Sequence, residues 1–163
     1  MNYTNDNVKK ICNFYMSDWH FTVMLLPYIN REINKKTKVI TILEKDMTDK
    51  VETLVRKLNL KNKEEIFQIN WKNSDVDKFI NKLKKELNDN KQILLIVNGT
   101  NCFIKKVNDE INRELNNEKF GQKKIKILDC YDFESNKNNM SDILKEYDEM
   151  LNTSGEIKVK SVL

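Results

Sequence analysis

The chain has 163 residues, of which 39% are hydrophobic and 33% are charged, and its net charge at pH 7 is +4. This length suits one domain with a substantial core, and the composition is that of a folded chain rather than a disordered one. The longest apolar stretch, Phe21 to Ile29, is far shorter than the roughly 18 residues that a membrane-spanning helix needs. We therefore expect a single soluble domain over residues 1–163, in the cytoplasm and without membrane contact.

The positive charge is weak evidence for a nucleic-acid partner. Only three of the 29 basic residues are arginine, the side chain best suited to bidentate contacts with phosphate and guanine. Asparagine occurs 23 times, beside abundant lysine and isoleucine, and these three residue types share A/T-rich codons. We attribute the excess of lysine to codon bias, and we do not expect nucleic acid among the partners.

The cysteines and the single histidine exclude several kinds of site. Cys12, Cys102 and Cys130 are widely separated in the sequence, which is typical of free thiols in a reducing compartment. A structural zinc site needs about four clustered ligands, and three distant thiols with one histidine do not supply them. We predict no bound metal and no cofactor.

Short apolar runs alternate with amphipathic segments along the chain. The five runs that we predict to be strands are residues 38–44, 66–71, 92–99, 125–132 and 156–163. The third run is apolar on both faces, as a strand covered by helices on both sides should be. In the last run, lysines alternate with apolar residues and would discourage edge-to-edge pairing, so we place it at the edge of the sheet.

The segments between these runs show helical periodicity. The apolar stripes run from Met47 to Leu58, Val76 to Leu87, Phe103 to Leu115 and Met140 to Leu151, and a capping box at Ser74 opens the second of them. Strand–helix–strand repeats of this size favour a parallel sheet with right-handed crossovers. We predict an α/β fold, a three-layer sandwich with a mostly parallel five-stranded sheet flanked by about five helices.

An earlier helix is predicted to start after Ser17, which is a suitable N-cap residue. Its spacing places four apolar residues on the face that packs against the sheet: Trp19, Leu26, Ile29 and Ile33. Pro27 lies inside this helix and should kink it or start a second one. Tyr15, Ser17 and His20 should lie near its N-terminal end, where they could line a ligand pocket.

Two common kinds of catalytic or cofactor site are excluded by the sequence. The chain has only Gly99, Gly121 and Gly155, so it contains neither the Gly-x-Gly-x-x-Gly fingerprint nor a phosphate loop. His20 is the only histidine and no Gly-x-Ser-x-Gly segment is present, which argues against a serine or cysteine nucleophile activated by a histidine base. We assign no catalytic residue.

Polar residues follow several of the predicted strands, at the edge where parallel sheets bind ligands. Glu44 and Asp46 follow the first strand, Asn98 ends the third and Asp132 ends the fourth. Such residues are also favoured in turns and helix caps, which is the interpretation we prefer. The alternative is that Glu44, Asp46 and Asp132 hold a magnesium ion. A receiver-type phosphorylation site would need an aspartate where the third strand has Asn98.

Two segments resemble the MEDS sensory domains of bacterial and archaeal regulators. Residues 9–21, KKICNFYMSDWHF, are similar to the opening of that family, and residues 127–132, ILDCYD, resemble its late strand. The resemblance implies a RecA-like fold without a phosphate loop that serves as a sensor. The matched positions are Tyr15, Cys130, Tyr131 and Asp132. The family's glycine-containing turn after the first helix is replaced here by EINKKTK.

These observations favour a non-enzymatic sensor or regulatory module that binds a small molecule and acts on a partner protein. The candidate ligand-binding residues are Tyr15, Ser17, His20, Glu44, Asn98, Tyr131 and Asp132. One alternative is a magnesium-dependent phosphoester-processing enzyme that uses the carboxylates at the strand ends. A second alternative is a nucleic-acid-binding accessory protein, which the positive charge suggests.

Overall fold

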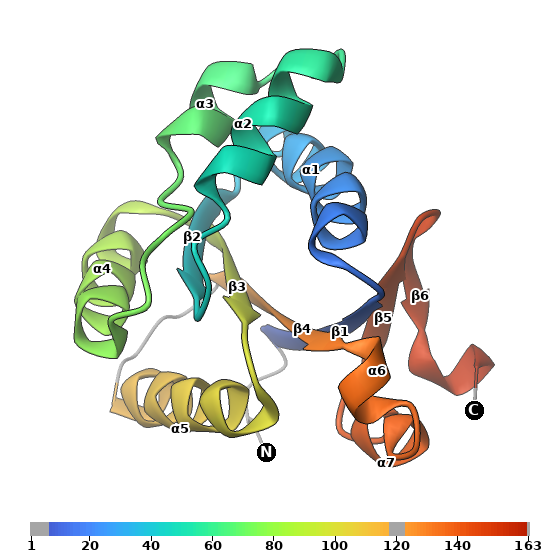
Figure 1. The fold of residues 1–163 in the computed structure, drawn as a ribbon. Helices are drawn as coiled ribbons and strands as arrows, with labels where there is room; N and C mark the ends of the chain where they lie inside the picture. Colours follow the sequence, from blue (N-terminus) through green and yellow to red (C-terminus); the bar gives the residue numbers. More distant parts are fainter. Residues whose placement is uncertain (1–6, 118–122, 163) are drawn as a thin grey trace.

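The computed structural model describes residues 7–117 and 123–162. They form a six-stranded sheet with helices on both faces (Figure 1). The strand order is β2-β3-β4-β1-β5-β6, and all neighbours are parallel except β5 and β6. The strands are β1 (Val8–Tyr15), β2 (Lys38–Leu43), β3 (Gln92–Asn98), β4 (Lys124–Asp132), β5 (Glu149–Asn152) and β6 (Gly155–Lys158).

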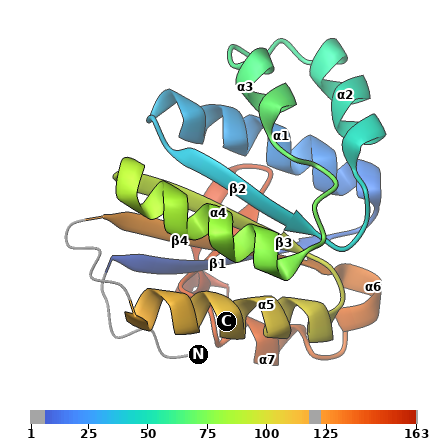
Figure 2. The same ribbon diagram turned by 90° about the vertical axis from the view of Figure 1, so that its left-hand side faces the viewer.

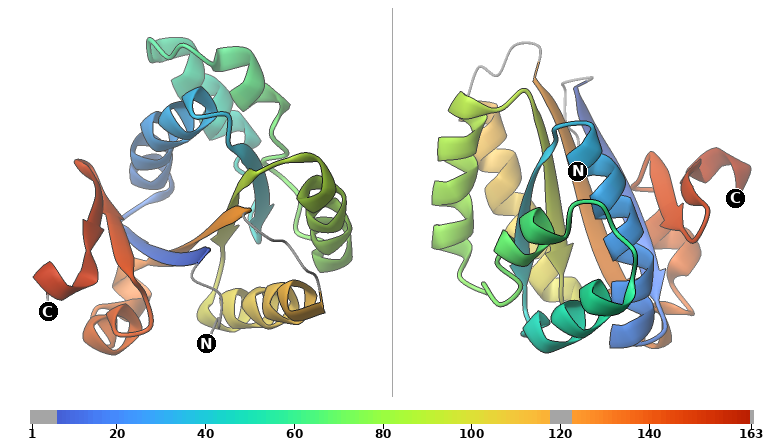
Figure 3. Two further views of the ribbon diagram at one scale, coloured as in Figure 1. Left: turned by 180° about the vertical axis from the view of Figure 1, so that it is seen from behind. Right: turned by 90° about the horizontal axis from the view of Figure 1, so that it is seen from above.

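Two groups of helices cover the two faces of this sheet (Figures 1 and 3). One face carries α1 (Asp18–Asn34), α2 (Thr48–Lys57) and α3 (Lys63–Gln68). The other face carries α4 (Val76–Asp89), α5 (Asn101–Asn117), α6 (Phe133–Asn136) and α7 (Met140–Leu144). Each group encloses its own apolar cluster against the sheet. The predicted three-layer, mostly parallel α/β fold is confirmed, with six strands instead of five and seven α-helices instead of about five.

One of the two central strands of the sheet is β1, which the five predicted strands did not include. It pairs with β4 on one side and with β5 on the other. The prediction of a strand over residues 66–71 is wrong, because this segment contains the end of α3 and the connector that follows it. Ile66 and Trp71 are still buried, whereas Phe67 is 40% exposed, and the Trp71 indole Nε1 donates a hydrogen bond to the Ile66 carbonyl at 2.9 Å.

The C-terminal region also differs from its predicted structure. The helix predicted from Met140 to Leu151 ends at Leu144, and Leu151 lies in β5. β6 occupies the edge of the sheet, as expected, but it is shorter than the predicted strand and a 3₁₀ turn over Val159–Ser161 follows it. Gly155 begins β6 with φ near +112°, a backbone conformation that residues with a side chain rarely adopt.

Helix α1 starts as predicted, and three of the four residues of its predicted inner face pack against the core while Trp19 does not. The Ser17 hydroxyl accepts a hydrogen bond from the His20 amide at 3.1 Å, and the helix continues through Pro27 to Asn34. Leu26 and Ile29 are fully buried, whereas Trp19 is 46% exposed. Because α1 is apolar around most of its circumference, a second stripe that contains Phe21 and Leu25 decides which side faces the sheet. Helix α4 likewise begins as expected, although its N-cap is Asp75 rather than Ser74.

No helix in the described ranges, residues 7–117 and 123–162, combines the length and the apolar character that crossing a membrane requires.

We predict that Leu26→Ala lowers the free energy of unfolding by about 2–5 kcal/mol, as truncations of fully buried leucines do. Trp19→Ala should lower it by less, because Trp19 is 46% exposed and its ring lies beneath the Lys50 ammonium near the surface. Urea-induced unfolding of the two variants measures both values. A larger loss from Trp19→Ala would mean that α1 packs on its other face.

Candidate functional site

A cavity of about 680 Å³ opens at the edge of the sheet where the parallel strands β1 to β4 end. Tyr15, Asn98 and Asp132 end β1, β3 and β4, and Glu44 directly follows β2, so four strands contribute to its wall. The starts of α1, α5 and α6 close the remaining sides. The volume lies within the range of about 300–1,000 Å³ that is usual for small-molecule pockets, and the position is the one where open α/β sheets bind their ligands.

One side of the cavity is formed by the paired side chains of Tyr15 and Asn98. The Asn98 amide donates hydrogen bonds to the Tyr15 hydroxyl at 2.9 Å and to the Cys130 carbonyl at 3.3 Å. The Tyr15 ring packs edge-on against Phe21, with 5.2 Å between the ring centroids. Burial raises the pKa of Tyr15 to about 12, although the hydrogen bond from Asn98 opposes this shift. Tyr15 therefore stays protonated at neutral pH, and its hydroxyl can donate a hydrogen bond to a ligand.

The three carboxylates of the magnesium hypothesis each cap a turn or a helix. Glu44 Oε1 accepts a hydrogen bond from the Thr100 amide at 2.7 Å, and Asp132 Oδ2 accepts one from the Ser135 hydroxyl at 2.7 Å. Asp46 accepts one from the Thr48 amide at 2.9 Å, and its hydrogen bonds with Thr48 hold the pKa of Asp46 below its usual value.

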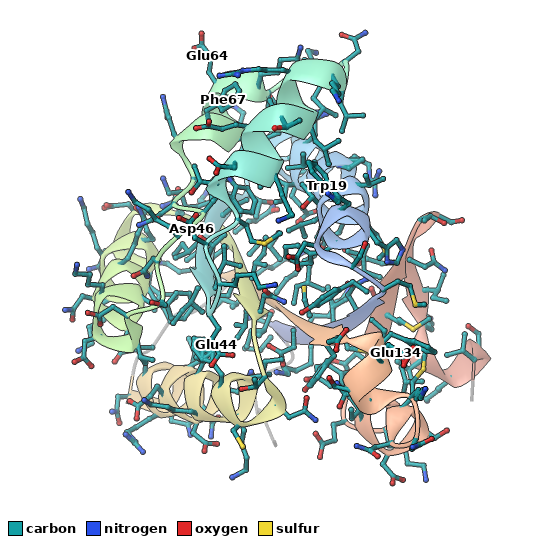
Figure 4. All side chains as sticks on the ribbon, in the orientation of Figure 1. Trp19, Glu44, Asp46, Glu64, Phe67 and Glu134 are labelled. Carbon is teal, nitrogen blue, oxygen red and sulfur yellow. The ribbon has the colours of Figure 1, made fainter. Side chains whose placement is uncertain are left out.

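The structure does not bring these three carboxylates together. Glu44 and Asp132 line the cavity, but Asp46 does not, and Figure 4 shows Glu44 beside α5 and Asp46 on the side of α2. Across residues 7–117 and 123–162, no group of three or more histidine, cysteine, aspartate or glutamate side chains is placed to hold a metal ion.

The charged groups of the lining are mostly acidic. Asp18, Glu44 and Asp132 contribute carboxylates, and Lys45 contributes the one lysine of the lining. The Lys45 ammonium lies 2.9 Å from Asp18 Oδ2, so this positive charge is already paired. A phosphate group would meet a net negative field in this cavity, whereas an amine would be attracted to it.

The connection between β1 and α1 is too short for a phosphate loop. Only Met16 and Ser17 separate the strand from the helix, and neither is glycine. The ring of His20 holds this connection in place, because its Nδ1 accepts a hydrogen bond from the Met16 amide at 2.9 Å. His20 therefore supports the backbone and does not line the cavity, in contrast to its prediction as a ligand-binding residue.

Tyr131 was also predicted to bind a ligand, but it lies in the apolar cluster on the other face of the sheet. Its ring stacks on Phe14, and its hydroxyl lies 2.6 Å from the hydroxyl of Tyr147. The Tyr147 hydroxyl in turn donates to Asp129 Oδ2 at 2.6 Å. Burial, and then the nearby Asp129 carboxylate, raise the pKa values of both tyrosines.

Asp129 is the centre of this buried polar network. Its carboxylate is fully buried and lies 2.7 Å from the Lys10 ammonium, which is itself almost completely buried. Asn108 of α5 donates to the same carboxylate at 2.9 Å and also accepts a hydrogen bond from Lys10. The network thus links β1, β4, α5 and the segment before β5, and none of its members lines the cavity.

Five of the seven predicted site residues therefore share one cavity: Tyr15, Ser17, Glu44, Asn98 and Asp132. Sequence reasoning missed the helix starts opposite them, where the Asn101 amide donates to the Asn136 side-chain oxygen at 2.6 Å. It also missed Gly99, where a β-carbon would lie 2.7 Å from the Phe103 ring and 2.8 Å from Glu44 Oε1. The Asn98-Gly99 pair at a strand end was the available signal, since glycine permits such close approach.

We predict that Lys10→Met lowers the free energy of unfolding by about 3–5 kcal/mol, because it leaves the buried Asp129 carboxylate without its ionic partner. Lys9→Met is the matched control, since the neighbouring Lys9 side chain is 42% exposed and pairs with Glu149 near the surface. It should cost less than about 1 kcal/mol. Chemical denaturation measures the free energy of unfolding of the two variants. Equal losses would show that the buried pair stabilises the fold no more than the surface pair does.

The raised pKa of Tyr15 predicts a loss of stability in alkali. In the unfolded chain this phenol ionises near pH 10, whereas in the folded chain it ionises near pH 12. Its contribution to stability is therefore complete below pH 10 and falls as the pH rises toward 12. Tyr15→Phe should make the decrease in unfolding free energy over this range shallower. Urea titrations at several alkaline pH values measure it, and an unchanged pH dependence would contradict the burial of this phenol.

Comparisons with known proteins bear on the fold alone. No protein-family model matches the chain, and no curated protein matches it either. Among solved structures, the fold is similar to that of an ATPase domain, with a TM-score of 0.55 and 10% sequence identity. The similarity covers 90% of this chain and 69% of that one. At this identity the likeness supports a common α/β architecture, and it does not assign an activity to this chain.

Proposed function

We propose that this chain is a non-enzymatic cytoplasmic sensor domain, which binds a small polar molecule and passes on its presence to a partner protein. The observation that carries this proposal is the cavity of about 680 Å³ at the ends of four parallel strands. Its wall combines a hydroxyl, several side-chain amides and carboxylates, which can orient a polar ligand, with one face of a partly buried tyrosine ring.

The charges of the cavity favour a particular class of ligand. Two carboxylates, those of Glu44 and Asp132, face no lysine at ion-pair distance within the described residues. A molecule with an amino group would satisfy them, while hydroxyl or amide groups on the same molecule could bind Tyr15 and Asn98. Nucleotides fit poorly, because the lining is acidic and the corner between β1 and α1 has no glycine-rich loop for phosphate.

A binding role agrees better with the lining than a catalytic role does. Glu44 and Asp132 are engaged as caps, and Ser135 donates its hydroxyl proton to Asp132 without a histidine base beside it. His20, the single histidine of the chain, already accepts the Met16 amide proton through Nδ1. The resemblance of residues 9–21 and 127–132 to MEDS domains further supports a sensor function.

A thermal-shift and tryptophan-fluorescence screen tests this function with three groups of compounds. These are polyamines and basic amino acids, neutral nucleosides, and ATP with magnesium. A compound of the first two groups should raise the melting temperature in a saturable manner, whereas ATP should not. Robust hydrolysis of ATP or of a phosphoester by the purified protein would contradict the proposal.

Two substitutions locate the binding in the cavity. Asp132→Asn removes a carboxylate charge but keeps a good capping residue for α6, so affinity for a cationic ligand should fall by at least about tenfold while stability is kept. Asp46→Asn is the matched control, because the Asp46 carboxylate also accepts a main-chain hydrogen bond, from the Thr48 amide, but lies outside the cavity. Equal effects of the two substitutions would place the ligand elsewhere.

A further inference from the structure

The strand β2 forms one edge of the sheet, and part of its outer side is open. It pairs with β3 over Lys38–Leu43, and no strand of the described residues pairs with its other side. The Leu43 amide donates to the Asn73 carbonyl at 2.8 Å, so the main chain at this position faces outward. Because main-chain groups alternate sides along a strand, the amides and carbonyls of Val39 and Thr41 also face outward. Within the described chain, no hydrogen bond to these groups is present.

A groove of about 260 Å³ lies along this open half of β2. Figure 2 shows β2 with α4 below it and α1 and α3 above it, and the connector from α3 to α4 meets the C-terminal half of β2, where the Thr41 hydroxyl donates a hydrogen bond to the Asn70 carbonyl. Phe79 of α4 forms the base of one wall, and Ile33 and Ile69 contribute apolar surface to the other. The two walls of the groove are therefore formed by side chains from the helices on the two faces of the sheet. Its floor is the unpaired main chain of β2.

The two walls differ in charge. Lys78 and Lys82 are four residues apart on α4, both are exposed, and neither has an ion-pair partner among residues 7–117 and 123–162. Lys38 adds a third ammonium to the lining, at 3.8 Å from Glu86. The wall formed by Ile33 and Ile69 also carries the exposed side chains of Glu65 and Gln68, so the three lysines of the lining outnumber its one carboxylate. An extended chain placed here would direct alternate side chains toward these two different walls.

We propose that this groove binds an extended acidic segment of a partner protein, which adds a strand to the sheet along β2. Main-chain hydrogen bonds would form with Val39 and Thr41, acidic side chains would face Lys78 and Lys82, and apolar ones would face Ile33 and Ile69. Strand addition at an exposed edge is a recurring mode of peptide recognition, and a second copy of this chain is disfavoured because its lysines would meet the same lysines. This inference deepens the proposed function and rests on it for the existence of a partner.

Two short synthetic peptides test the charge preference. One is an acetylated Val-Glu-Val-Glu-Val-Glu amide, and the other has lysine in place of each glutamate. By fluorescence anisotropy at about 50 mM salt, where charge attraction is only partly screened, the acidic peptide should bind and the basic one should not. The double variant Lys78→Glu and Lys82→Glu should reverse this preference, with a loss of at least about tenfold for the acidic peptide.

The control variant changes two lysines outside the groove, Lys85→Glu on α4 and Lys106→Glu on α5, which are both exposed. It carries the same change of net charge and should keep the affinity for the acidic peptide. Absence of binding by the acidic peptide, or an equal loss in the control variant, would overturn the proposal. Asp132→Asn should leave peptide binding unchanged. The proposal for the groove and the proposal for the cavity can therefore be contradicted independently of each other.

Hydrogen exchange tests strand addition directly. The amides of Val39 and Thr41 should exchange quickly in the free protein and at least about tenfold more slowly when the acidic peptide is bound, as newly formed ladder hydrogen bonds require. Binding without protection of these two amides would overturn the strand-addition geometry. Protection that grows with protein concentration in the absence of peptide, together with a dimer in analytical ultracentrifugation, would overturn the acidic partner in favour of a second copy.

Discussion

The buried ion pair between Lys10 and Asp129 is the contact on which the arrangement of the sheet depends. In the register of β1 and β4, Asp129 lies opposite Cys12, two residues beyond Lys10, so the pair reaches diagonally between the two central strands. A shift in register would leave a charge unpaired in the core, at a cost of several kcal/mol. Asn108 and Tyr147 bind the same carboxylate. Helix α5 and the approach to β5 are therefore fixed by the same interaction as the strands.

This register also decides which residues meet at the edge of the sheet. Tyr15 lies opposite Asp132, Asn98 opposite Cys130, and Leu43 opposite Asn98, so β1 to β4 end at nearly the same level. The polar residues at these ends therefore surround one cavity. The solved ATPase domain shares the architecture, and the acidic lining and the short corner at Met16 and Ser17 are the features on which the proposed class of ligand rests.

The elements that could be predicted from the sequence are those whose local pattern agrees with their final environment. β3 is apolar on both faces, β4 contains the apolar residues Ile125, Ile127 and Leu128, and α2, α4 and α5 have clear apolar stripes. β1 was not among the predicted strands, because Lys9 and Lys10 interrupt its apolar pattern. Lys10 is satisfied by Asp129, a residue far away in the sequence. The segment 66–71 was assigned wrongly, since six residues are too few to separate a strand from a short buried helix.

The residues of the candidate site were likewise predictable only where the local sequence was sufficient. The strand-end argument gave Glu44, Asn98 and Asp132, which line the cavity, because it requires only that the strands be parallel. Tyr15 was named from its place before the first helix and from the family resemblance. The contributions of Asn101 and Asn136 depend on which helices start beside each other, and this follows from the strand order. Tyr131 was assigned to the site from the resemblance of residues 127–132 to a known family. Successive residues of a strand point to opposite faces, and the Tyr131 side chain lies in the apolar core.

The central position of β1 also has a consequence for the synthesis of the chain. β1 leaves the ribosome first, yet Val8 pairs with Ile125 and Ile11 pairs with Glu149. Most of the polypeptide must therefore be made before this strand finds either neighbour, and such long-range pairing slows folding. In that interval the segment is an unpaired strand with apolar residues, and charges within such a segment discourage association with other chains. Lys10, which is paired with Asp129 in the finished core, is one of two charges that this segment carries before its partners are made.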